Sequence, residues 1–65
     1  MIDKLFAAIS TKNKQAVEMM EVFGEDYWYV KNMLLEISGM RAAFEIIAGH
    51  SYTDHLLEVM SIEQA

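Results

Sequence analysis

The amino-acid sequence predicts an all-α fold: a small helical hairpin with a short third helix, associating as a helical homodimer. Apolar residues recur at helical spacing in three consecutive segments, and Gly24 and Gly49 stand where the first two segments end. The chain has no proline to break a helix and no cysteine to form a disulfide. We therefore expect one domain over residues 1–65, with helices at about residues 2–23, 26–48 and 52–60.

The first helix is expected over residues 2–23, where apolar residues follow the helical period. Lys12 and Asn13 interrupt the pattern, and Ser10 and Thr11 have side chains that commonly cap helix N-termini. The sequence leaves two alternatives open: one continuous helix, or a short helix, a kink and a second helix. The apolar positions are Ile2, Leu5, Phe6, Ile9, Ala16, Val17, Met20 and Phe23.

The central helix, expected over residues 26–48, has the most extensive apolar pattern, so the other elements must pack against it. We expect Phe44 to be among its most buried residues. Its predicted core face consists of Val30, Met33, Ile37, Met40, Phe44 and Ile47, widened by Leu34, Tyr27 and Ala48.

The connection between these two helices has two competing interpretations. Gly24, followed by Glu25 and Asp26, predicts a tight turn, because glycine commonly ends a helix and acids favour the start of the next. A seven-residue apolar repeat runs straight through Gly24, as in a continuous coiled coil: Ile2, Ile9, Ala16, Phe23, Val30, Ile37 and Phe44. We prefer the hairpin because it buries both amphipathic faces within one chain.

The third helix is expected over residues 52–60. Gly49 ends the central helix, and Ser51 with Asp54 forms an approximate capping box. A helix of this length is unstable alone, so it must dock on the central helix. Residues 61–65 are expected to fray. The apolar side of this helix is formed by Leu56, Leu57, Val59 and Met60.

A second apolar line lies on the far side of the central helix. Its small residues permit close approach of another helix, and a hydrophobic content of 54% is more than so short a chain buries as a monomer. We therefore predict a homodimer interface formed by Trp28, Leu35, Gly39, Ala42 and Ile46.

Charge and hydropathy exclude several classes of protein. A net charge of -5 and a pI near 4.7 disfavour direct binding to nucleic acid, because phosphate contacts need clustered lysine and arginine. The apolar runs are too short for a signal peptide or a membrane span. We expect a cytoplasmic protein that binds neither a membrane nor nucleic acid directly.

The densest group of chemically active side chains comprises His50, Asp54, His55 and Glu58. Helical metal sites use such spacings, but the paired Glu-x-x-His pattern of di-iron bundles and the zinc motif HExxH are absent. We favour a structural interpretation, with Asp54 in the cap and the others on a solvated face. We accordingly expect no catalytic residue, no metal and no cofactor, and keep a metal-binding helical protein as an alternative.

The run YWYV, Tyr27 to Val30, spans more than a full helical turn, so its rings are expected to point in several directions. We expect Tyr27 to pack in the core and Trp28 to serve the interface, where tryptophan is enriched.

Two functions fit these features. The first is a non-enzymatic helical interaction module that binds and regulates or inhibits an unidentified partner protein, as a homodimer. The alternative is an acidic nucleic-acid mimic, such as a phage-type, anti-CRISPR-like inhibitor of a host defence nuclease. It rests on an acidic surface in which Glu18, Glu21 and Glu25 share one helix face.

Overall fold

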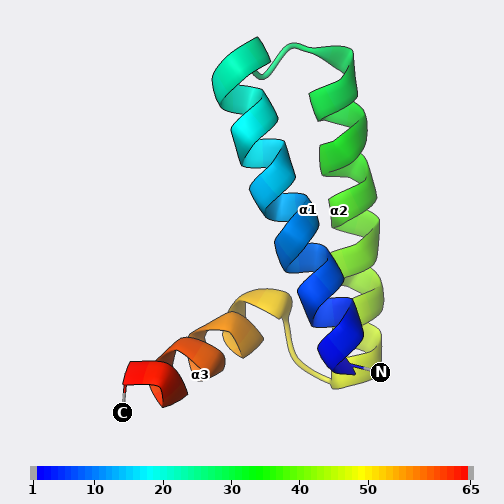
Figure 1. The fold of residues 1–65 in the computed structure, drawn as a ribbon. Coiled ribbons are helices and arrows are strands. Elements are labelled where there is room, and N and C mark those ends of the chain that lie inside the picture. The colour runs from blue at the N-terminus through cyan, green and yellow to red at the C-terminus, as the bar shows by residue number, and fades with distance from the viewer. Residues whose placement is uncertain (1, 65) are drawn as a thin grey trace.

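The structure, a computed structural model, describes residues 2–64 and consists of three helices: α1 (Ile2–Phe23), α2 (Trp28–Ala48) and α3 (Tyr52–Gln64). α1 and α2 form an antiparallel hairpin, and α3 turns away from it at the end opposite the α1–α2 turn (Figure 1). The all-α prediction is confirmed for this part of the chain.

α1 is one continuous helix, so the kinked alternative is wrong. The polar residues that suggested a break have partners on other elements. The Ser10 hydroxyl oxygen lies 2.7 Å from the hydroxyl oxygen of Tyr52, and Lys12 Nζ lies 2.8 Å from Glu36 Oε1. Because Ser10 bonds to Tyr52, its side chain serves tertiary packing rather than a new helix start.

A turn at Gly24 separates the first two helices, so the continuous coiled coil is wrong as well. Gly24 has a φ of 87°, and its N–H donates to the Met20 carbonyl at 2.8 Å. α2 begins at Trp28, two residues later than expected, because Tyr27 is extended and occupies the N-cap position. Most residues of the seven-residue repeat are nonetheless buried, because the hairpin places the residues from α1 against those from α2. The buried ones are Ile9, Ala16, Val30, Ile37 and Phe44.

Two apolar clusters form the core. One lies near α3 and contains Ile9, Phe44 and Tyr52, and the other, further along the hairpin, contains Ala16, Met33 and Ile37. The predicted burial of Phe44 is confirmed, since it has 0% exposure.

The predicted core face of α2 is too wide. Ile47 and Leu34 were expected to be core residues but are exposed. Only α1 packs along the length of α2, and one neighbouring helix covers a narrow stripe of another. α3 covers neither residue because it leaves the hairpin instead of lying along it (Figure 1).

α3 docks through its N-terminal half. Tyr52 is buried, and its ring packs 5.2 Å from the ring of Phe6. Arg41 on α2 covers the same ring at 5.3 Å and donates a 2.8 Å hydrogen bond from Nη2 to Thr53 Oγ1. The predicted packing on α2 is thus accompanied by contacts to α1, while Leu57 on the same helix is exposed.

α3 is also longer than expected. It continues to Gln64 instead of ending near Met60, because no glycine or proline follows Gly49 to stop it. The frayed tail predicted for residues 61–65 is therefore wrong as far as Gln64, and Ala65 lies outside the described residues.

Replacing Tyr52 by phenylalanine tests how strongly its hydroxyl holds α3. The variant keeps the ring but leaves the partly buried Ser10 hydroxyl without this partner. We expect the free energy of unfolding in urea to fall by about 1 kcal/mol, the usual net contribution of such a bond. Tyr29→Phe, at an exposed ring, is the control and should change stability by less than about 0.5 kcal/mol. A Tyr52→Phe variant as stable as the parent would contradict this role.

Candidate functional site

The apolar ridge of α2, which we define as Trp28, Leu35, Gly39, Ala42 and Ile46, is exposed along its whole length. Leu35 is 72% exposed, Ile46 84% and Trp28 63%. From Trp28 to Ile46 the ridge extends for about 27 Å at 1.5 Å per residue. The structure therefore leaves a long apolar line free for a partner.

The helical period explains why α1 does not cover this ridge. At 100° per residue its five positions fall within a narrow sector almost opposite to that of Ile37 and Phe44, which face α1. Nothing lies within 4 Å of a Cβ added to Gly39, so the centre of the ridge is open. An approaching helix would meet only small residues there.

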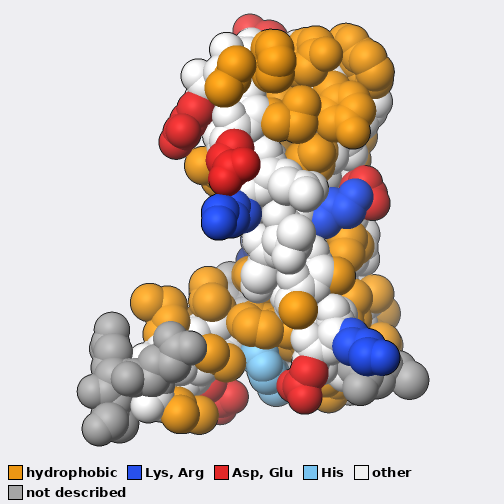
Figure 2. Space-filling view, in the orientation of Figure 1, with side chains coloured by type: hydrophobic (Ala, Val, Ile, Leu, Met, Phe, Trp, Pro, Cys, Tyr) orange, Lys and Arg blue, Asp and Glu red, His pale blue; other side chains and the backbone are white. Residues whose placement is uncertain are grey.

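A second apolar surface, which was not predicted from the sequence, lies at the turn end of the hairpin. We call it the aromatic patch: Val22, Phe23, Tyr27, Trp28 and Tyr29, all exposed except the half-buried Tyr27. Figure 2 shows apolar side chains gathered over this end of the molecule.

The rings of the aromatic patch lie close together but face different directions, as predicted: the planes of Tyr27 and Trp28 are 55° apart and those of Trp28 and Tyr29 are 73° apart. The Phe23 and Tyr27 ring centroids are 5.0 Å apart, and those of Trp28 and Tyr29 are 5.6 Å apart. Tyr27 precedes α2 in an extended conformation, with its ring beside that of Phe23. Tyr27 thus packs in this patch instead of the core.

The acidic surface is less regular than predicted. Glu18 and Glu21 lie on α1 and are exposed, but Glu25 lies in the turn beyond the end of α1 at Phe23. The three carboxylates therefore do not share one helix face. The interpretation as a nucleic-acid mimic depended on carboxylates evenly spaced along a rigid helix, and this arrangement is not present for these three residues.

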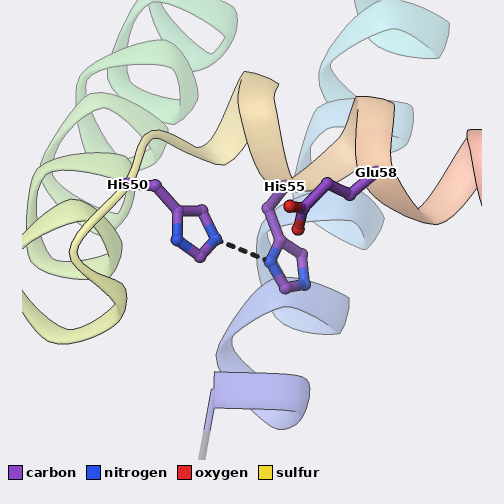
Figure 3. Close-up of side chains that lie close together, drawn as sticks. All are labelled: His50, His55 and Glu58. Carbon is purple, nitrogen blue, oxygen red and sulfur yellow. Dashed lines mark hydrogen bonds between the residues drawn. The ribbon is translucent and has the colours of Figure 1, made fainter.

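Three of the four residues in the predicted polar group come together where α3 leaves the hairpin (Figure 3). His50 Nε2 lies 2.9 Å from His55 Nδ1, and the two rings are stacked with a 9° interplanar angle. One donor atom each from His50, His55 and Glu58 lies within 4.8 Å of the other two. We call these three residues the histidine cluster.

The connection between α2 and α3 positions this cluster. Gly49 adopts the left-handed conformation and donates its N–H to the Glu45 carbonyl, which ends α2 at Ala48, two residues before His50. Ser51 Oγ accepts the Asp54 N–H at 3.1 Å and starts α3. The Ser51 half of the predicted capping box is therefore present, and the Asp54 carboxylate is not part of the histidine cluster.

Aromatic side chains pack beside the imidazole rings. The ring of Phe6 lies 4.6 Å from that of His55, and the ring of Phe44 contacts both histidines edge-on. Both histidines are half-buried and Glu58 is exposed. The cluster thus has an apolar side and a side open to solvent, where histidine side chains reach the surface (Figure 2).

Within residues 2–64, no helix is long and apolar enough to cross a membrane. Comparisons with protein-family models, curated proteins and solved structures find no match to this chain.

Proposed function

We propose that this chain is a non-enzymatic helical interaction module that pairs with a second copy of itself through the apolar ridge and binds a partner protein. The exposed ridge carries this proposal. Isolated apolar residues on a protein surface are ordinary, but a continuous line of them along one helix is typical of an interface.

The total surface area supports an interface of this kind. The chain exposes 4848 Å², whereas a monomer of 7.5 kDa is expected to expose about 4,250 Å². The excess of about 600 Å² approaches the roughly 800 Å² that each partner contributes to a standard protein interface. A second copy on the ridge would cover much of this excess.

The spacing of the ridge favours a second copy as the occupant. A two-fold axis across the middle of the ridge sets Leu35 opposite Ile46 of the second copy, and Gly39 opposite Ala42 of the second copy. Both pairs are centred on the same point of α2, so one antiparallel arrangement satisfies both. Leu35 and Ile46 then contact each other across the axis, while the small Gly39 and Ala42 allow the two helices to approach closely at the centre. Trp28 lies at the rim of this interface.

The aromatic patch provides a surface for the partner protein. Tyrosine, tryptophan and phenylalanine are enriched at interfaces, and tryptophan and tyrosine dominate binding hot spots. Residues 15–30 contain four acidic residues and no basic residue, so the segment that carries the aromatic patch is acidic, although Lys12 lies beside Trp28 and Tyr29. The matching partner is a protein with an apolar pocket rimmed by lysine and arginine.

Replacing Ile46 by lysine tests the pairing through the ridge. Ile46 is 84% exposed, so a lysine at this position costs the monomer little stability. In the dimer the ammonium group would be buried with no opposite charge beside it. We expect sedimentation equilibrium to show that the parent protein is a dimer. The dissociation constant of the Ile46→Lys dimer should be at least about a hundredfold higher than that of the parent.

Ile62→Lys is the matched control, because Ile62 is also an exposed isoleucine, at 76%, but lies on α3 away from the ridge. It should remain dimeric. A parent protein that sediments as a monomer at high micromolar concentration would refute the pairing, and so would equal weakening by the two substitutions.

A further inference from the structure

The geometry points to a binding site for a zinc-type divalent transition-metal ion at the junction of α2 and α3, held by His50, His55 and Glu58. Two imidazole nitrogens and a carboxylate oxygen are a donor set that zinc accepts, with a solvent molecule in the fourth position. This site lies apart from the apolar ridge and does not depend on the proposed dimer.

The distances in the histidine cluster are close to those that a metal requires. Two nitrogens bound tetrahedrally to zinc at 2.0–2.1 Å are about 3.3 to 3.4 Å apart. His50 Nε2 and His55 Nδ1 are already 2.9 Å apart, so the pair needs to open by only about 0.4 Å. Glu58 is exposed and has a flexible side chain, so its carboxylate is free to close the remaining gap.

The hydrogen bond between the rings shows that the two nitrogens already face one another. One nitrogen carries a proton and donates it, and the other accepts it with its lone pair. For metal binding the donor ring moves that proton to its other nitrogen, so that both lone pairs face the ion. Each neutral imidazole still carries one proton after this tautomer change.

The surrounding backbone and rings support the two histidines before any ion binds. The left-handed Gly49 and the cap formed by Ser51 place His50 beside the first turn of α3. Phe6 packs edge-on against His55, and Phe44 packs edge-on against both imidazoles. The ordering of the nitrogen donors is therefore largely complete in the folded chain.

The donor set also selects the kind of ion. Imidazole nitrogen suits zinc and its neighbours in the transition series, whereas magnesium and calcium prefer sites built from oxygen donors. The exposed Glu58 leaves the solvent side open, so an ion can enter from water. We infer selectivity for Zn²⁺ over Mg²⁺ and Ca²⁺.

Metal binding would act as a clamp on α3. His50 belongs to the connection that follows α2, while His55 and Glu58 belong to α3. An ion held by all three ties the connection to the second turn of α3, beyond the docking contacts of Tyr52. Because the ion binds only the folded arrangement, it also raises thermal stability.

Titration calorimetry of the full chain with ZnCl₂ at constant pH tests the site. We expect one Zn²⁺ per chain and a melting temperature about 20 °C higher at a zinc concentration near a hundred times the dissociation constant. His50→Gln and Glu58→Gln should each weaken zinc binding by at least about tenfold. Loss of a group that only supports a metal ligand already costs about that much, and these residues are proposed as ligands themselves. Mg²⁺ should produce no comparable heat or shift.

Asp54→Asn is the matched control, because Asp54 is also an exposed carboxylate on α3 but lies outside the histidine cluster. It should bind zinc as the parent does. Absence of zinc binding by the folded parent at high micromolar concentration would overturn the site, and so would equal weakening by Asp54→Asn and Glu58→Gln. Repeating the titration with Ile46→Lys separates the two proposals, since a monomeric variant should retain the metal site.

Discussion

Replacing Phe44 by alanine is expected to unfold most of the protein. Phe44 is completely buried, and the rings of Phe6, Tyr52 and both histidines surround it. A Phe→Ala change in a core costs about 3 to 5 kcal/mol. A domain of 65 residues has a total stability of only about 3 to 10 kcal/mol, so the loss is a large part of the whole.

The measurement is urea denaturation followed by circular dichroism at one fixed protein concentration, because self-association makes apparent stability depend on concentration. Ile47→Ala is the control, since Ile47 lies on the same helix but is half-exposed, and it should cost much less than Phe44→Ala. If Phe44→Ala melts like the parent, the cluster around Phe44 does not form the core.

Replacing Gly39 by leucine is expected to change the monomer and the dimer in opposite directions. A Cβ added at Gly39 meets nothing within 4 Å among the described residues of the single chain. Removing a glycine from a helix interior stabilises that helix by up to about 1 kcal/mol. In the proposed dimer, however, the leucine occupies the point where Gly39 approaches Ala42 of the second copy. The overpacking should raise the dissociation constant about ten- to hundredfold.

Gly39→Ala is the matched comparison, because it supplies most of the gain in helix propensity with only one added methyl group. Sedimentation equilibrium should show that Gly39→Ala remains much more strongly dimeric than Gly39→Leu. Circular dichroism at low concentration should show helical monomers for both. Equal dimer affinities for the two variants would mean that Gly39 does not lie at a close helix contact.

The helices and the hairpin were predictable because their signals are local. Apolar residues at the helical period mark each segment, and Gly24 and Gly49 supply left-handed turns at the ends of α1 and α2. The end of α3 was wrong because no comparable signal lies near Met60, and the chain simply continues its last helix.

The candidate sites were predictable to different degrees. The exposure of the apolar ridge follows from periodicity, because α1 is the only other long helix within residues 2–64 and occupies the opposite side of α2. The aromatic patch was missed because it depends on the conformation of one residue, Tyr27, at the start of α2. The polar group was recognised in the sequence, but its spacing alone did not indicate that His50 and His55 form a stacked pair.

By itself, the sequence determined the all-α class and the two opposite apolar faces of α2, because the 3.6-residue period decides these features. It favoured the turn at Gly24, but the seven-residue repeat through that position also fitted a continuous helix. The tertiary structure alone decided the direction of α3. That direction depends on how Tyr52 packs against Phe6 and Phe44. Phe6 lies far along the chain from the other two residues, so local sequence signals do not report this contact. By leaving the hairpin, α3 keeps Ile47 exposed, and its docking beside the Gly49 turn brings His50 against His55.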